Sequence, residues 1–259
     1  MHCAGTKWRV YGPSMKLREH LHRIAVFIVT ALGTIAYAVP TSAAQPEVNK
    51  PLRIGIIGTG NIGSALARHW ARAGHELMIS SRHPDQLQEM AKTLGPRTRV
   101  GAPREAATFG DVVVVSIPYG SMPQLGQDLQ AELKGKIVLD TGNPYPSRDG
   151  PMAEEARRKG TGVTSPQFLP GTRLVRAFNA INARPLSTEA NRAGERYAIP
   201  LAGDDAEALK VAERLVRDAG FDPVVVGGLA RAKDFDVGTP VYVKLLTAKE
   251  LRKALNLAP

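Results

Sequence analysis

Cysteine is almost absent from the sequence, since Cys3 is the only one among 259 residues. A chain with a single cysteine cannot form an internal disulfide, and it offers neither a thiolate pair nor a cysteine-ligated zinc site. Because Cys3 lies in a segment that we expect to be removed, the mature chain is predicted to have no thiol nucleophile. This absence fits an oxidising compartment without requiring one.

Histidine is scarce in the part of the chain that we expect to fold. After residue 45 only His69, His75 and His83 occur, so residues 84–259 contain no histidine. An acid or base built on histidine, as many hydroxy-acid dehydrogenases use, is therefore hard to assemble in the second half. Four other side chains could take that role, although each is expected to be a surface or packing residue: Tyr145, Lys233, Asp234 and Lys244.

Basic residues outnumber acidic ones, but they form no lysine-rich run interleaved with aromatic residues. The formal charge is +10, and five basic residues and one acidic residue fall within the first 44 positions, which leaves +6 for the remainder. This excess suits an anionic small molecule better than a nucleic acid, so no nucleic-acid partner is predicted.

Residues 1–44 have the three parts of a secretory signal peptide. Basic residues precede an apolar run over 24–39, and small residues follow it up to Ala44. We expect cleavage after Ala44 and a true start at Met15. The apolar run is shorter than the roughly 20 residues that a spanning helix needs, so the membrane is a partner only during export, with an uncleaved anchor as the alternative.

The rest of the chain is long enough for one sizeable core. Residues 45–51 are a predicted linker and residues 52–259 a predicted single domain, because neither an internal repeat nor a low-complexity segment follows Asn49. Export would place this domain in the bacterial periplasm. If the leader is an artefact, the domain would stay in the cytoplasm.

Short β-rich runs alternate with helical stretches as far as Gly142. Four consecutive valines at 112–115 indicate a strand that is covered on both faces. The alternation predicts an α/β fold of the Rossmann type, with a doubly wound, mostly parallel sheet. Strands are expected at 52–57, 76–81, 97–101, 111–118 and 136–141, and helices at 61–74, 84–95, 103–108 and 121–133.

The regularity ends beyond Gly142. A proline-rich loop precedes a predicted helix at 152–159, and the tail from Leu229 is predicted to be a helical elaboration in two pieces, split at 238–240. Three further strands (172–178, 196–203, 221–228) and a helix (204–220) are expected between them. Five apolar residues of the last piece would share one side of a helix, ordinarily a core face and sometimes the surface of a homodimer: Val241, Leu245, Leu246, Leu251 and Leu255.

A GxGxxG run follows the first predicted strand and opens the first predicted helix. Gly58 permits the tight turn, Gly60 lets the backbone approach a pyrophosphate, and Gly63 allows helix and strand to pack closely. The helix N-terminus adds unpaired N–H groups that suit an anion. The run therefore predicts a dinucleotide site, which also includes Thr59, Asn61 and Ile62.

The second predicted strand ends in Ser81 and Arg82, where an acid would bind the ribose of NAD. An Asp or Glu at this place accepts from the 2′-hydroxyl and repels a 2′-phosphate, whereas a hydroxyl and a guanidinium attract the phosphate. NADP is therefore favoured over NAD. Ile117 and Pro118 end the fourth strand at the same edge of the sheet, so their backbone is expected beside the cofactor.

Several segments, in this order and spacing, resemble the deazaflavin (coenzyme F-420)-dependent NADP oxidoreductase family and the NADPH-binding domain of the six-transmembrane metalloreductases. The similarity covers residues 52–250, and its most specific part combines the glycine run, Ser81-Arg82 and RAFNAI at 176–181. It implies that NADP lies along the glycine turn and that an isoalloxazine-like ring lies near Asn179. Asn179 stands where the deazaflavin enzymes have a histidine, so the second coenzyme could be a flavin or a deazaflavin.

The resemblance and the scarcity of histidine favour an NADPH-dependent oxidoreductase that passes hydride to a flavin or deazaflavin, a transfer that needs orientation at contact distance and little else. Residues 179–182 and 229–235 are expected to flank the acceptor. Two alternatives stay open: a small-molecule imine or keto reductase resembling pyrroline-carboxylate reductase, and a dinucleotide-binding sensor or assembly protein without turnover. Neither a catalytic residue nor a metal site is predicted.

Overall fold

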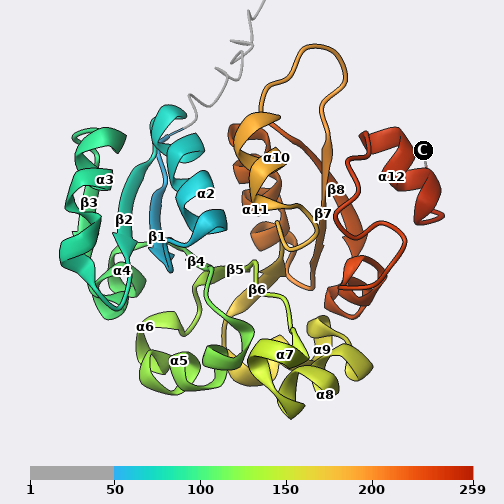
Figure 1. The fold of residues 1–259 in the computed structure, drawn as a ribbon, viewed down its shortest axis with the longest axis horizontal. Helices are drawn as coiled ribbons and strands as arrows, with labels where there is room; N and C mark the ends of the chain where they lie inside the picture. The colour runs from blue at the N-terminus through green and yellow to red at the C-terminus, as the bar shows by residue number, and fades with distance from the viewer. Residues whose placement is uncertain (1–49, 259) are drawn as a thin grey trace, which may run out of the picture. The chain divides into compact units, whose positions relative to one another are not determined.

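The computed structural model describes residues 50–258, so the predicted signal peptide lies outside the described part. Eight strands form one sheet in the order β3-β2-β1-β4-β5-β6-β7-β8, with β6 and β7 antiparallel and the other neighbours parallel (Figure 1). The prediction of an α/β, Rossmann-type, mostly parallel sheet is confirmed. The strands are β1 Arg53–Ile57, β2 Glu76–Ser80, β3 Thr98–Gly101, β4 Val112–Val115, β5 Ile137–Asp140, β6 Arg173–Arg176, β7 Ala198–Gly203 and β8 Asp222–Gly227.

Helices cover both faces of the sheet, because alternate side chains of each central strand point to opposite faces. In β4, Val112 and Val114 pack into one hydrophobic cluster, while Val113 and Val115 pack into another. The first cluster contains apolar residues of α2 (Asn61–Arg72) and α11 (Ala206–Asp218), and the second contains those of α4 (Pro103–Phe109) and α6 (Gln130–Leu133). The remaining helices are α3 Gln88–Leu94, α5 Met122–Asp128, α7 Pro146–Asp149, α8 Pro151–Lys159, α9 Thr161–Phe168, α10 Ala183–Thr188 and α12 Ala248–Ala254, with 3-10 turns η1 Pro84–Leu87, η2 Tyr119–Ser121 and η3 Leu229–Phe235.

Trp70 joins α2 to the elements that follow much later in the chain. Its side chain is fully buried, its indole N–H donates to the carbonyl oxygen of Leu215 at 2.9 Å, and its ring meets Phe178 edge-on at 6.0 Å. Figure 1 accordingly shows α2 beside α10 and α11. The helix that opens at the glycine run is thereby fixed against the second half of the fold.

Helix α9 has a sequence that does not predict a helix. TGVTSPQF contains a glycine, three β-branched residues (Thr161, Val163 and Thr164) and an internal Pro166, all of which are poor helix formers. Tertiary contacts compensate, because the carboxylate of Asp236 accepts from the backbone N–H of Thr161 at 2.9 Å and from its hydroxyl at 2.6 Å. A residue 75 positions away thus caps the helix.

The C-terminal tail differs from its prediction. Residues 229–235 form a 3-10 turn, and the helix expected after Pro240 begins only at Ala248, where Thr247 and Glu250 form a capping box. Val243 takes a left-handed conformation with φ 52°, which a continuous helix does not allow. The five apolar residues therefore do not share one helical face: Val241 and Leu251 are buried in the same core cluster, while Leu245 is 40% exposed.

No helix within residues 50–258 combines the length and the hydropathy needed to cross a bilayer. The predicted apolar leader falls outside that range and is untested by this finding.

Candidate active site

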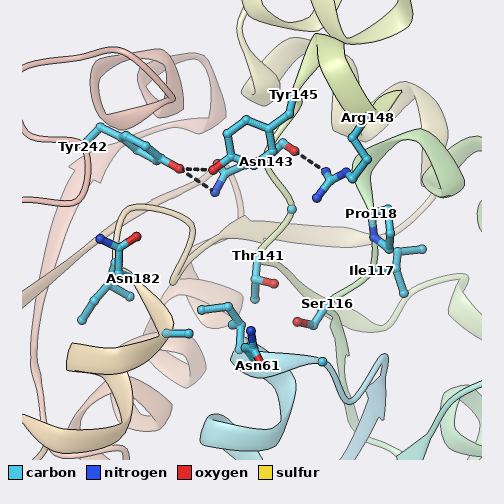
Figure 2. Close-up of a pocket in the computed structure, with 15 residues that line it drawn as sticks. Asn61, Ser116, Ile117, Pro118, Thr141, Asn143, Tyr145, Arg148, Asn182 and Tyr242 are labelled. Atoms are coloured by element: carbon cyan, nitrogen blue, oxygen red, sulfur yellow. Dashed lines mark hydrogen bonds between the residues drawn. The ribbon is translucent and has the colours of Figure 1, made fainter. Parts of the chain in front are cut away.

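A pocket of about 340 Å³ opens at the carboxyl ends of the parallel strands, where open α/β sheets bind their ligands (Figure 2). One side consists of the glycine turn at Gly60–Ile62 and the segment after β4, Ser116–Pro118. The other consists of residues that follow β5 and β6, together with one tyrosine from the tail. The residues of that second side are Thr141, Gly142, Asn143, Tyr145, Arg148, Ile181, Asn182, Ala183 and Tyr242.

The glycine turn has the shape of a cradle for a phosphate-bearing ligand. Gly58 has φ 96°, and a Cβ atom there would lie 2.3 Å from the carbonyl oxygen of Ser116, while a Cβ on Gly63 would lie 2.0 Å from the carbonyl oxygen of Gly58. A Cβ on Gly60 would meet no atom within 4 Å. The turn is therefore tightly packed on its protein side and open at Gly60, which is the face that a pyrophosphate needs.

Helix α2 begins directly at this open face. It has no side-chain cap at Gly60, so its first N–H groups are available to an anion. The turn is tied down behind it, since the hydroxyl of Ser64 donates to the carbonyl oxygen of Thr59 at 2.7 Å and the N–H of Gly58 donates to Ser80 at 3.0 Å. The residues present thus fit the diphosphate portion of a dinucleotide.

Ser81 and Arg82 lie outside the pocket, at the end of β2. Arg82 is exposed and forms no ion pair or side-chain hydrogen bond with the part of the chain that the structure describes. The hydroxyl of Ser81 accepts from the backbone N–H of His83 at 3.0 Å. β2 is the neighbour of β1, the strand that leads into the glycine turn, so Ser81 and Arg82 lie on the side of the turn where a ribose is expected. Binding of a 2′-phosphate by these two residues stays our prediction.

A buried ionic cluster lies beneath the pocket. Arg176, Asp140 and Asp236 meet there, with 2.6 Å between Nη1 of Arg176 and Oδ2 of Asp140 and 3.7 Å between Nη2 and Oδ1 of Asp236. Burial disfavours the charge on Arg176, but the two carboxylates outweigh it and raise the pKa of that guanidinium. Nη2 also donates to the carbonyl oxygen of Gly142 at 2.7 Å, so the cluster fixes the backbone of the pocket floor.

Three polar side chains form a connected wall on the second side of the pocket. The hydroxyls of Tyr145 and Tyr242 lie 2.5 Å apart, and the amide nitrogen of Asn143 donates to Tyr242 at 3.3 Å and to the carbonyl oxygen of Asn179 at 2.8 Å. Figure 2 shows all three side chains converging at the pocket. Burial, followed by the hydrogen bond to Tyr145, raises the pKa of Tyr242, so its hydroxyl stays protonated at neutral pH.

Arg148 supports this wall. Its guanidinium lies 5.2 Å from the centre of the Tyr145 ring and donates to the carbonyl oxygen of Asn143 at 2.8 Å. The same group makes two hydrogen bonds to Asp149, whose carboxylate accepts in turn from the backbone N–H of Tyr145 at 3.0 Å. Its charge is therefore already paired within the wall.

The RAFNAI loop carries backbone strain. Phe178 has φ 58° although it is bulky and 1% exposed, and such a conformation persists only where the surroundings impose it. The next residue, Asn179, is also buried, and its amide nitrogen donates to the carbonyl oxygen of Phe235 at 3.4 Å. Asn179 therefore does not line the pocket with its side chain, and acts on it through the carbonyl oxygen that holds Asn143.

The predicted site residues thus divide into three groups. Gly60, Asn61, Ile62, Ile117 and Pro118 line the pocket, Gly58, Thr59 and Gly63 shape the turn behind it, and Ser81, Arg82 and Asn179 lie outside its lining. None of residues 229–235, which are expected to flank the acceptor, lines this pocket, and their place beside the acceptor stays a prediction. Lys233, Asp234 and Lys244 are likewise absent from its lining.

Sequence reasoning missed most of the second side. Tyr145, expected to be a surface or packing residue, lines the pocket, as do Asn143 and Tyr242. Their only sequence signal is that Asn143 and Tyr145 closely follow a predicted strand, at the edge where ligands bind. Tyr242 carries no such signal. Within residues 50–258 there is no group of three or more side chains that could ligate a metal ion.

The comparisons with known proteins agree with this architecture. The sequence profile of the family described as NADP oxidoreductase, coenzyme F420-dependent, matches residues 53–144. A solved structure of a hypothetical protein from Sinorhizobium meliloti superimposes with a TM-score of 0.67 at 25% sequence identity, covering 76% of this chain and 95% of that one.

Two named relatives match over most of the chain. The F420-dependent NADP reductase of Methanothermobacter thermautotrophicus is 28% identical over 226 residues, which are 78% of this chain and 93% of the reductase. Metalloreductase STEAP3 of Rattus norvegicus is 27% identical over 205 residues, which are 76% of this chain but only 38% of the metalloreductase. The similarity predicted from the sequence, to the F420-dependent NADP oxidoreductases and to part of the metalloreductases, is thereby confirmed.

Proposed function

We propose that this protein transfers a hydride between NADPH and the ring of a flavin or deazaflavin, which occupies the pocket between the glycine turn and the Asn143 wall. The more general prediction, that the protein is an NADP-dependent oxidoreductase, is confirmed. It is supported by relatives that are named NADP reductases and by the family profile, which includes the glycine turn. The hydride acceptor is the part that we propose.

The observation that carries the proposal is the composition of the pocket. Its floor and one side are backbone and small side chains of the strand ends, and its other side is the hydroxyl and amide wall, without a histidine, lysine or free carboxylate among the lining residues. The lining residues thus include no histidine, lysine or carboxylate that could act as a general acid or base. A conjugated ring that accepts a hydride needs mainly a surface to lie on and hydrogen bonds to fix it.

The residues divide the work as follows. The open face at Gly60 and the N-terminus of α2 would hold the diphosphate, and Ser81 with Arg82 would bind the 2′-phosphate. The backbone of Ser116–Pro118 and Thr141–Asn143 would position the nicotinamide side, because the first segment follows β4, the neighbour of β1, and the second follows β5, the neighbour of β4. Bound NADPH supplies the hydride. The wall of Asn143, Tyr145 and Tyr242 would orient the acceptor and keep water from that face.

Anaerobic stopped-flow mixing of the protein with NADPH and, separately, FMN, FAD or a 5-deazaflavin tests the proposal. Loss of nicotinamide absorbance at 340 nm, at a rate that depends on the protein, is the expected result with at least one ring. An unchanged absorbance with every ring, from protein shown to bind NADPH, would overturn it.

A small-molecule imine or keto reductase is the second candidate, and the two tyrosine hydroxyls favour it because such a substrate needs a proton as well as a hydride. Cyclic imines and small ketones, offered with NADPH in the same instrument, separate it from the first candidate. NADPH oxidation by these substrates without any oxidation by flavins would transfer the assignment to this class.

We also propose export of the protein through residues 1–44. The basic start, the apolar run and the small residues before Gln45 support this, although they lie outside the described residues. N-terminal sequencing of protein from the native host decides the matter, with Gln45 as the expected first residue and an intact leader on cytosolic protein as the contrary result.

A further inference from the structure

Two tyrosine hydroxyls from distant parts of the chain meet in the pocket. Tyr145 follows β5 and Tyr242 belongs to the tail, 97 residues later, yet their oxygen atoms lie 2.5 Å apart (Figure 2). Both residues line the pocket. Packing of the two rings does not require their hydroxyl oxygens to meet. The contact is therefore a hydrogen bond between the two phenols.

A count of the protons at this contact leaves one without an acceptor. Each phenol has one proton, and one of the two donates to the other hydroxyl. The other proton does not go to Asn143, because the amide nitrogen of Asn143 is itself the donor to Tyr242 and to the carbonyl oxygen of Asn179, and its Oδ1 bonds to neither tyrosine. Among residues 50–258 neither hydroxyl has a further partner. One phenolic O–H, on a residue that lines the pocket, is therefore left without an acceptor in this part of the chain.

The pair is held in place at some energetic cost. Val243, directly after Tyr242, has φ 52°, an unfavourable conformation for a β-branched residue, and its N–H donates to the carbonyl oxygen of Ala180 at 3.0 Å. Tyr145 is fixed from the other side by Arg148 and Asp149. Strain of this kind concentrates where a structure must present a group to a ligand.

We propose that the Tyr145–Tyr242 pair donates its free O–H to a carbonyl oxygen of the hydride acceptor, on the pyrimidine portion that flavins and deazaflavins share. Arrival of the hydride makes this portion more negative, and a donor aimed at its oxygen stabilises the reduced ring more than the oxidised one. The bond is a hydrogen bond in both states, and no proton leaves the tyrosines. The inference rests on the proposed function, because it takes the acceptor from it.

The proton count predicts that the two single Tyr→Phe variants keep a free donor and that only the double variant loses it. In Tyr145→Phe the hydroxyl of Tyr242 keeps its proton free, and in Tyr242→Phe the hydroxyl of Tyr145 does, so each single variant retains one donor. Only the double variant has none. Tyr197→Phe is the matched control, since the hydroxyl of Tyr197 makes none of the hydrogen bonds described within residues 50–258 and does not line the pocket.

Titration of riboflavin, followed by difference absorption of its visible bands, is the first readout and requires no turnover. We expect the single variants to bind riboflavin within about threefold of the wild type and the double variant about tenfold more weakly, the worth of one neutral hydrogen bond, with loss of the band shift caused by hydrogen bonding to the carbonyl. The NADPH affinity of the double variant should equal that of Tyr197→Phe, which shows that the nucleotide side of the pocket is intact.

The outcomes separate the two proposals. A double variant that binds riboflavin with the affinity and band shift of the wild type overturns the donor pair, whatever the activity. A wild-type protein that binds NADPH and riboflavin but passes no hydride overturns the proposed function and leaves the donor pair supported if the double variant binds more weakly. Failure of the wild type to bind either riboflavin or 5-deazariboflavin overturns both.

Discussion

The two halves of the described chain build the pocket by different means. Residues 53–144, which match the family profile, supply the glycine turn and the strand ends. There, glycines without side chains and exposed backbone atoms leave space for a nucleotide. Residues 145–258 supply hydroxyl, guanidinium and aromatic side chains, held by strained backbone at Phe178 and Val243. The profile ends one residue before Tyr145. A nucleotide cradle within the family profile and a wall that lies mostly beyond it thus meet at one cavity.

The difference teaches which parts of the site tolerate change. A cradle made of backbone depends on close contacts that any added carbon disrupts, whereas a wall of side chains can lose one group and keep its shape. Damage to the packed side of the cradle, at Gly58 or Gly63, should therefore reduce stability and nucleotide binding together. Damage to the wall of Asn143, Tyr145 and Tyr242 should weaken binding of the acceptor while leaving the nucleotide site intact.

The largest effect is expected where the halves are joined. Arg176→Leu would leave Asp140 and Asp236 without their buried counter-charge and should destabilise the protein by about 3–5 kcal/mol in urea unfolding. Arg173→Leu, on the same strand, removes a half-exposed pair with Asp205 and serves as the control with a much smaller effect. Equal losses from the two variants would contradict the role given to the buried cluster.

Two alanine substitutions separate the packed side of the glycine turn from its open side. Gly63→Ala would place Cβ 2.0 Å from the carbonyl oxygen of Gly58 and should destabilise the fold by about 2–3 kcal/mol. Gly60→Ala meets no atom within 4 Å and should leave the unfolding midpoint unchanged, while it weakens NADPH binding because the added carbon occupies the ligand's side. Full NADPH affinity in Gly60→Ala would show that the ligand lies elsewhere.

Arg82→Asp addresses the choice between NADPH and NADH. Loss of a charge-assisted bond to the 2′-phosphate, with repulsion in its place, should weaken NADPH binding about 10- to 100-fold and leave NADH binding nearly unchanged. Arg217→Asp, an exposed position on α11, controls for the change in net charge. Fluorescence titration with both nucleotides measures the effect, and an equal loss for both would remove Arg82 from the 2′-phosphate site.

The smallest effect concerns the strain in the second half. Val243→Gly removes the cost of a β-branched residue at φ 52° and should raise the free energy of unfolding by up to about 1 kcal/mol, since the gain is partly offset by the flexibility of glycine. Riboflavin binding should weaken at the same time, because Tyr242 is held less firmly. Chemical denaturation checks the first expectation, and a clear loss of stability would mean that Val243 is not strained.

The sequence predicted the first half of the fold better than the second for physical reasons. Strands buried on both faces and a glycine turn leave local patterns, such as Val112–Val115 and the run from Gly58 to Gly63. Helix α9 leaves none, because it forms through the distant carboxylate of Asp236 rather than through its own propensity. In the tail the opposite happened, because the apolar spacing predicted a helix that does not form over Val241–Leu246. The left-handed conformation of Val243 and its hydrogen bond to Ala180 interrupt the helix there.

The same distinction explains the site. Residues of the glycine turn act through backbone geometry that their sequence dictates, so they could be named in advance. Tyr242 reaches the pocket only because the tail folds back to the loop at Ala180, a contact that no local pattern encodes. Tyr145 was named, yet its place in the wall depends on Arg148, Asp149 and a partner 97 residues away.

The most direct test of the account follows the hydride itself. NADPH carrying deuterium at the transferred position of C4 is mixed anaerobically with the protein and 5-deazariboflavin, whose reduced C5–H bond does not exchange with water, and the reduced ring is weighed by mass spectrometry. Direct transfer in the pocket predicts one deuterium in each reduced ring. Reduced rings without deuterium, formed in the presence of fully labelled NADPH, would contradict the account.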